Sequence, residues 1–352
     1  MKRRWLWAIA VVLLMSGCVF IFPPIPYHGD LNPGYPLPAK PDSAMRLAFG
    51  SCDNQRLDQH IWKPIVASKP DVWLWLGDMI YADTEDMDEM KAMYDRQKNS
   101  DGYTTLRSTA RIIGIYDDHD LGANNVDKYY PKKKESQALA LDFLDEPADS
   151  PRRSQEGDYI SYTWTVRGRS VQLILLDTRY HRDPPGPESD LLGERQWIWL
   201  EQQLNLHPPP DLTLIGSGVQ VFREDFWKEK WHDYPKSKTR LLQLLKACGR
   251  NGLVLLSGDR HHAELSVLKN FLPYPLYEVT SSGLTHYKGA LWYLTGQERN
   301  AYRVGKPLGA LNFGILDMYG TADGMTADIY LCDDKGMVRI EKRLNFSSLP
   351  PP

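Results

Sequence analysis

Short apolar runs bounded by turn-forming residues recur along the chain from Met45 onwards. Runs of this length between glycine, proline and aspartate are typical of buried strands, whereas longer segments that mix apolar and charged residues are typical of helices. The apolar runs predict strands at residues 46–50, 72–77, 112–116, 159–166, 171–176, 213–216, 253–257, 277–280, 313–318, 325–330 and 338–342. The mixed segments predict helices at residues 58–68, 86–98 and 192–206.

The order of these elements indicates the architecture. A helix lies between the first two predicted strands, and strand–helix–strand units pair in parallel with right-handed crossovers. The strands on either side of Gly168 predict an antiparallel pair, and the last three strands predict a meander. We therefore expect an α/β (α+β) fold, a two-sheet β-sandwich flanked by helices on both sides. It is predicted to occupy residues 45–345, followed by a C-terminal tail at 346–352.

The first residues are typical of an export signal. Three basic residues follow Met1, and an apolar run extends from Trp5 to Met15, about half the length of a membrane-spanning helix. The following Ser16-Gly17-Cys18 resembles the lipobox of bacterial lipoproteins. We expect a lipoprotein signal peptide at 1–17, lipid on Cys18 and a proline-rich tether at 18–44 that anchors the protein to the cell envelope membrane. The alternatives are a plain signal peptide with a chance cysteine, and export by the twin-arginine route.

The amino-acid composition and the net charge disfavour two classes of protein, nucleic-acid binders and disulfide scaffolds. The 352 residues carry a net charge of −3, with 42% apolar and 25% charged residues, which is ordinary for a globular protein. A dedicated nucleic-acid binder is usually strongly basic, so this class is disfavoured. Four cysteines are too few for a disulfide scaffold. Besides Cys18 and Cys52, there remain Cys248 and Cys332, which either pair or are buried separately.

Ionisable residues cluster directly after four predicted strands. The clusters are Gly50-Ser51-Cys52-Asp53, Gly77-Asp78-Met79-Ile80-Tyr81, Asp117-Asp118-His119-Asp120 with Asn124 downstream, and Gly258-Asp259-Arg260-His261-His262. Taken alone, each cluster can be explained structurally, as a turn at a strand end or as residues buried in the core. Together they crowd one sheet edge, where α/β proteins place their sites, and uncompensated charges there would repel each other. A metal cluster explains all four at once.

These motifs resemble those of calcineurin-like metallophosphoesterases, and most closely the PhoD-like (alkaline phosphatase D) family. Gly77-Asp78-x-x-Tyr81 is similar to the bridging aspartate and tyrosinate of purple acid phosphatases, and Asp118-His119-Asp120 stands where other members carry Asn-His-Glu. Further agreement comes from Leu176-Asp177-Thr178-Arg179-Tyr180 and from Thr280-Ser281-Ser282-Gly283-Leu284. The resemblance implies a phosphoric ester hydrolase that acts on monoesters, diesters or both.

The resemblance also implies a dinuclear or larger metal centre, with Fe3+ and Ca2+ expected and other divalent ions as alternatives. Cys52 and Tyr81 would bind the iron, and Asp78 would bridge two ions. Asp118 and Asn124 would bind the second ion. Asp259 and His261 would complete the cluster from the far strand.

Four further residues receive roles or alternatives from the same comparison. His119 is expected to face the leaving group, or else to be a supporting residue held by Asp120. Arg179 either holds a phosphate oxygen or forms an internal salt bridge with an aspartate such as Asp177. Asp53 either binds metal or caps a turn. His262 is a less favoured ligand than His261, because adjacent side chains at a strand end point apart.

Two other functions remain as alternatives. One is a phosphodiesterase for an envelope polymer or a phospholipid on the same scaffold. The other is a non-catalytic binding lipoprotein, which would be expected to have lost ligand residues. Since every expected ligand type is present in the chain, we favour hydrolysis of a phosphate ester by a metal-activated hydroxide.

Overall fold

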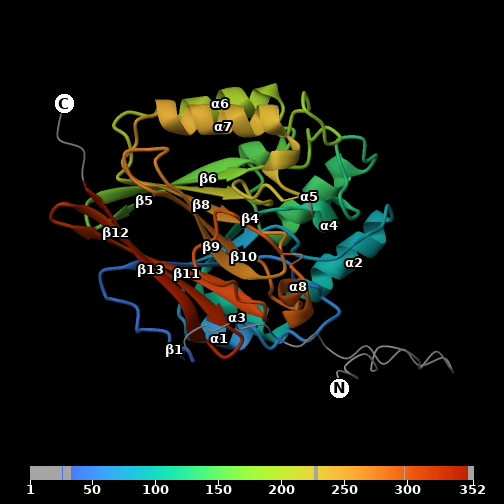
Figure 1. Cartoon of the computed structure of the whole chain (residues 1–352). Coiled ribbons are helices and arrows are strands. Elements are labelled where there is room, and N and C mark those ends of the chain that lie inside the picture. Colours follow the sequence, from blue (N-terminus) through green and yellow to red (C-terminus); the bar gives the residue numbers. More distant parts are fainter. Residues whose placement is uncertain (1–25, 27–32, 226–228, 297, 348–352) are drawn as a thin grey trace, which may run out of the picture.

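Two sheets packed face to face, with helices on both outer faces, make up the computed structural model (Figure 1). It describes residues 26, 33–225, 229–296 and 298–347. The first sheet has the spatial order β1-β13-β12-β11-β2-β3-β4. Its strands are β1 (Tyr35–Pro36), β2 (Met45–Gly50), β3 (Val72–Leu76), β4 (Arg111–Ile115), β11 (Asn312–Thr321), β12 (Gly324–Asp333) and β13 (Met337–Ser347). Only β2, β3 and β4 pair in parallel within this sheet.

The second sheet has the order β5-β6-β7-β8-β10-β9. Its strands are β5 (Ile160–Val166), β6 (Arg169–Leu176), β7 (Leu212–Ser217), β8 (Leu253–Ser257), β9 (Ala263–Leu268) and β10 (Leu276–Ser281). The four central strands are parallel, and β5 and β9 are antiparallel edge strands. The parallel strands of both sheets therefore end in loops that can carry a shared site.

Helices cover the outer face of each sheet. The first sheet is covered by α1 (Trp62–Ala67), α2 (Met87–Lys98), α3 (Asp101–Thr109) and α5 (Lys133–Phe143), and the second by α6 (Glu194–Leu204) and α7 (Pro235–Ala247). Two short helices, α4 (Asp118–Leu121) and α8 (Ala290–Leu294), and two 3-10 turns at Pro151–Arg153 and Trp231–Asp233 complete the described elements. None of the helices in the described residues has the length and apolar character needed to cross a bilayer.

Strand β3 shows how sequence alternation builds these layers. Its five residues are all buried, and successive side chains point to opposite faces. Leu74 lies in the core between the sheets, whereas Trp73 and Trp75 pack beneath the helices. The two indoles lie 5.1 and 5.4 Å from the ring of Trp62 on α1, both in edge-to-face contact, a geometry that adds to the gain from burial.

The predicted two-sheet sandwich with helices on both sides is confirmed. Every predicted strand is present within a few residues, and the last three form the expected meander. Strand β9 and helices α3, α5 and α7 were not among the elements predicted above. The predicted disulfide alternative is excluded, because Cys248 at the end of α7 and Cys332 on β12 are free thiols that pack in different core clusters.

The ends of the domain differ from the predicted boundaries. Strand β1, inside the predicted tether, pairs with β13, and the guanidinium of Arg46 donates to the carbonyl of Pro38 at 3.0 Å. At the other end β13 continues to Ser347, into the predicted tail. The predicted signal peptide and Cys18 lie outside the described residues.

Candidate metal centre at the strand ends

Four parallel strands deliver the ionisable residues to one place. Cys52 follows β2, Asp78 follows β3, Asp117 and Asp118 follow β4, and Asp259 follows β8. Three of them have left-handed backbone angles, with φ of 61° at Cys52, 50° at Asp78 and 63° at Asp259. Such angles cost non-glycine residues energy and are concentrated at functional sites. The chain therefore turns sharply at each strand end, which aims the side chain across the edge of the sheet.

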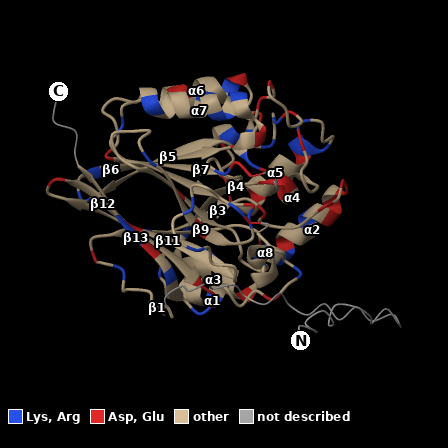
Figure 2. Ribbon diagram, viewed as in Figure 1, with Lys and Arg blue, Asp and Glu red and all other residues tan. Residues whose placement is uncertain are grey.

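The carboxylates of this group are close together and incompletely paired. Asp78, Asp117, Asp118 and Asp259 each offer an oxygen within 4.8 Å of the others, and Asp78, Asp118 and His119 form a second such group. One carboxylate oxygen of each of the four aspartates has no hydrogen-bond partner among the described residues. Figure 2 shows acidic residues gathered around α4 and its neighbouring loops. Buried carboxylates in this arrangement are the donor set that a cation requires.

The electrostatics of the site agree with that interpretation. Burial, together with the neighbouring aspartates, raises the pKa of Asp78 and that of Asp259 well above the usual range. Burial also raises the pKa of the Cys52 thiol, and the adjacent carboxylates add to this. Asp118 is the exception: although burial opposes it, Arg179, His119 and the Asn125 N–H lower its pKa to about 2. Without a cation the charged forms of Cys52, Asp78 and Asp259 are costly, so the residues fit a metal centre.

Cys52, Asp78 and Tyr81 form one side of the cluster. The Cys52 Sγ lies 3.3 Å from Oδ2 of Asp78, and the Tyr81 hydroxyl lies 3.4 Å from the same oxygen. The backbone ties these loops together, because the Asp53 N–H donates to the Asp78 carbonyl at 2.9 Å. A thiol, a phenol and a carboxylate therefore converge, as the sequence predicted.

Two histidines face Tyr81 from the second sheet. The Nε2 atoms of His261 and His286 lie 3.3 and 2.9 Å from the Tyr81 hydroxyl oxygen. These two nitrogens are 3.3 Å apart. His261 was predicted from its strand-end motif, whereas His286 was not. The sequence feature that could have indicated His286 is its position two residues after the Thr280–Leu284 motif.

Helix α4 positions His119. The Asp117 side chain caps the helix, and the Asp120 carboxylate accepts a hydrogen bond from the Asp117 N–H at 2.9 Å. Together these two bonds form a capping box. The His119 ring lies against the Tyr81 ring, with centroids 4.0 Å apart and the planes tilted by 31°. Its Nδ1 lies 2.7 Å from an oxygen of Asp83. The supporting carboxylate is therefore Asp83 and not Asp120, which instead accepts from the Ile80 N–H at 3.1 Å.

Arg179 is held inside the protein beside the cluster. Its Nε donates to Asp117, and its Nη2 lies 2.6 Å from Glu229 and 3.6 Å from Asp118. Of the two roles predicted for Arg179, the internal salt bridge is present, but its partners are Asp117 and Glu229 and not Asp177. That residue instead accepts from the backbone N–H groups of Arg179 and Tyr180. Arg179 Nη1 is buried without a hydrogen-bond partner among the described residues.

Two predicted candidates, Asn124 and Asp53, do not join the carboxylate cluster. Asn124 is exposed, and the contact from this segment comes instead from Asn125, whose N–H donates to Asp118 at 2.6 Å. The Asp53 carboxylate accepts from the amides of Gln59 and Gln97, both at 2.7 Å. Burial raises its pKa to about 7 despite these amides. Asp53 is thus a buried structural carboxyl. Asp83 and His286 join the site without having been predicted, and Asp117 joins it from a predicted cluster in which it had no assigned role.

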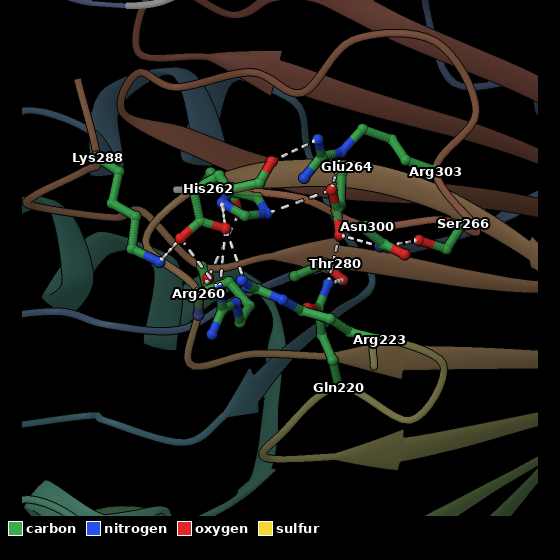
Figure 3. A network of polar contacts seen from close by, with 12 residues as sticks. Gln220, Arg223, Arg260, His262, Glu264, Ser266, Thr280, Lys288, Asn300 and Arg303 are labelled. Atoms are coloured by element: carbon green, nitrogen blue, oxygen red, sulfur yellow. Dashed lines mark hydrogen bonds and ion pairs between the residues drawn. The ribbon is translucent and has the colours of Figure 1, made fainter. Parts of the chain in front are cut away.

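The buried side chain of His262 points into a polar network behind the site (Figure 3). Its ring nitrogens lie 3.5 Å from Glu264 and 4.0 Å from Glu298. The Glu298 carboxylate accepts from Arg260 and Arg223, both at 2.9 Å, and from Lys288. Because Arg260 lies between Asp259 and His261, and Lys288 lies two residues after His286, this carboxylate links two segments that carry site residues.

Comparison with known proteins places this arrangement in a family. The family model described as PhoD-like phosphatase matches residues 47–290. Alkaline phosphatase D of Bacillus subtilis (strain 168) is 24% identical over a 276-residue alignment, and the match covers 64% of this chain and 47% of that protein. The chain thus spans about half the length of this curated relative.

Two solved structures resemble the fold. A structure of PhoD matches with a TM-score of 0.67 at 16% identity, covering 90% of this chain and 74% of that one. A structure titled as GAP50, the anchor in the inner membrane complex of Plasmodium, matches with a TM-score of 0.56 at 13% identity, covering 87% and 90%. At these identities the likeness concerns the fold alone.

Proposed function

Because this chain belongs to the PhoD-like phosphatase family, we propose that it hydrolyses phosphoric esters with a metal centre at the strand ends. The observation that carries the proposal is the group of four aspartates, each of which offers a carboxylate oxygen within 4.8 Å of the others and has one buried oxygen without a hydrogen-bond partner among the described residues. Such a group repels itself unless a cation neutralises it. Metal-assisted hydrolysis is the chemistry that this donor set serves.

The donor atoms support two kinds of ion. Cys52 and Tyr81 offer a thiolate and a phenolate beside Asp78, and strongly donating anionic ligands of this kind favour a trivalent ion such as Fe3+. Asp117 and Asp118 offer only oxygen, which suits a hard divalent ion such as Ca2+. Asp78 belongs to both groups and would bridge them. When bound, two such ions polarise the phosphoryl oxygens and provide a hydroxide near neutral pH.

The chain's own residues orient the ester. His119 lies against Tyr81, and Asp83 holds its Nδ1, so the second ring nitrogen is left to hydrogen-bond the departing oxygen. Burial opposes the charged imidazole, but Asp83 and the nearby aspartates raise the pKa of His119 above its usual value. Arg179 neutralises Asp117 and retains Nη1 as a donor toward a non-bridging phosphate oxygen.

The site of action is proposed from the sequence. The basic start, the short apolar run and Ser16-Gly17-Cys18 support an exported lipoprotein that is anchored to the envelope membrane through Cys18. Mass spectrometry of the protein purified from bacterial membranes is expected to find an acylated Cys18 as the first residue. An unmodified mature N-terminus at another residue would contradict the anchor.

The hydrolase proposal is tested with Asp78→Asn, which keeps the size of the side chain and removes its charge. We expect hydrolysis of 4-nitrophenyl phosphate and of bis(4-nitrophenyl) phosphate to fall at least about 100-fold, because even residues that only support a metal ligand cost about 10–100-fold when they are changed. Asp323→Asn, on an exposed turn between β11 and β12, is the matched control and should keep native activity. Full activity of Asp78→Asn, with its native fold verified by circular dichroism, would refute the metal mechanism.

A further inference from the structure

Three donor atoms meet at one point between the sheets. The Tyr81 hydroxyl oxygen lies 3.3 Å from His261 Nε2 and 2.9 Å from His286 Nε2. The two Nε2 atoms lie 3.3 Å from each other. The imidazole rings have centroids 4.3 Å apart and an angle of 75° between their planes, an edge-to-face contact.

Hydrogen bonding does not account for all three contacts. An imidazole nitrogen either carries a proton and donates, or carries a lone pair and accepts, and it cannot do both. If His286 donates to His261, it has no lone pair left for the Tyr81 hydroxyl. At most two edges of the triangle are therefore direct hydrogen bonds, and the third close contact has no proton to bridge it.

A shared cation accounts for all three. Metal–nitrogen bonds of about 2.0–2.1 Å with ligand–metal–ligand angles between octahedral and tetrahedral place neighbouring ligand atoms about 2.9–3.4 Å apart. All three observed separations fall in this interval. We propose that His286 is a ligand of the same ion as Tyr81 and His261, which adds a second imidazole to the centre. This proposal rests on the proposed function.

The surroundings hold the His286 ring in this orientation. Its other nitrogen, Nδ1, lies 3.3 Å from the Thr285 hydroxyl, and that hydroxyl accepts from the Asn54 N–H at 2.7 Å. On the other side, the Lys288 N–H donates to the His261 carbonyl at 2.9 Å. The loop with His286 is thus fastened to both the Cys52 loop and the His261 loop. A hydrogen-bond partner on the second nitrogen is characteristic of metal-bound histidines.

The experiment compares Co2+ binding by the metal-stripped native protein and by His286→Gln. Absorption in the visible region follows the binding and reports the ligands around the ion. We expect His286→Gln to bind the ion at the Tyr81 site at least about 10-fold more weakly and to shift its absorption. His232→Gln, the same change at an exposed histidine, should match the native protein. His286→Asp, which restores a donor atom, should recover binding with a different spectrum.

The outcomes separate this proposal from the one on which it rests. Native affinity and a native spectrum in His286→Gln would overturn the ligand role, even if the variant were inactive. If His286→Gln does not fold, a native spectrum in folded His286→Asp would overturn it equally. A native chain that binds no Co2+ and hydrolyses no phosphate ester would refute the proposed function itself.

Discussion

The negative charge of Glu298 compensates a cluster of buried cationic side chains. Replacing Glu298 should therefore strongly destabilise the fold. Its carboxylate is 0% exposed and is in contact with three cations, Arg223, Arg260 and Lys288, which are 0%, 0% and 5% exposed. Glu298→Gln keeps the shape of the side chain but removes its charge and one acceptor. The three cations then remain buried with less compensation.

The expected magnitude follows from this burial. Removing one partner of a buried ion pair costs about 3–5 kcal/mol, because an uncompensated charge is left behind. Arg223 retains a second carboxylate partner in Asp225, so Arg260 and Lys288 lose most. We therefore expect the free energy of unfolding to fall by about 3–5 kcal/mol. That is a large part of the stability of an ordinary domain.

Urea denaturation followed by tryptophan fluorescence measures the loss. The matched control is Glu188→Gln, since the Lys236–Glu188 pair is 3.5 Å apart with side chains 64% and 87% exposed. Exposed pairs contribute about 0–1 kcal/mol, so the control should stay near the native value. A double-mutant cycle of Glu298→Gln with Lys288→Met should give a coupling energy of about 0.5–3 kcal/mol.

The result that would refute this reasoning is a Glu298→Gln variant within 1 kcal/mol of Glu188→Gln by the same measurement. Such a result would mean that the Glu298 charge does not stabilise its neighbours as proposed. A large loss in both variants would point to an effect of glutamine itself and not of burial. A coupling energy of zero would show that Lys288 and Glu298 contribute independently.

Three further predictions follow from the site and its surroundings. His119→Asn should slow esters of poorly acidic alcohols by about 100-fold or more but leave esters of 4-nitrophenol much less affected; equal losses for both leaving groups would argue against proton donation. Burial raises the pKa of Glu278 to about 7, so its contribution to stability is full below its ordinary pKa and declines as the pH rises to 7. Glu278→Gln should therefore lose less stability than the native protein between pH 5 and pH 8 in urea denaturation, and an identical pH dependence would contradict this. Removal of metal by a chelator should abolish hydrolysis, lower the melting temperature and, if Tyr81 binds Fe3+, bleach a visible charge-transfer band; a fully active chelated protein would exclude a metal role.

Much of the fold follows from local pattern. The alternation of Leu and Trp in β3 already indicates a strand buried on both faces, and short apolar runs located the other strands within a few residues. Strand β9 was missed although Glu264 and Ser266 alternate with apolar residues, a pattern typical of a strand. In the structure Glu264 is buried against Arg303, a partner 39 residues away that no local rule reveals.

The candidate site was predictable in kind but not in full. Cys52, Asp78, Tyr81, Asp118, His119, Asp259 and His261 were found because they follow strands, and parallel strands end at a common edge. Asn124 was proposed because it lies a short distance downstream of the Asp117–Asp120 cluster in the sequence. The turn after α4, where Gly122 has φ of 150°, leaves it exposed.

By itself the sequence determined most of the strands, the layers, the family and the chemical types of the candidate site residues, because these depend on periodicity and on which residues follow each strand. The tertiary structure alone decided which side chains meet. Asp83 was brought to His119, His286 to Tyr81 and Glu229 to Arg179. These contacts join segments from different strand ends, so their geometry depends on how the two sheets pack and on how each loop turns. Packing, and not local pattern, therefore assembles the cluster.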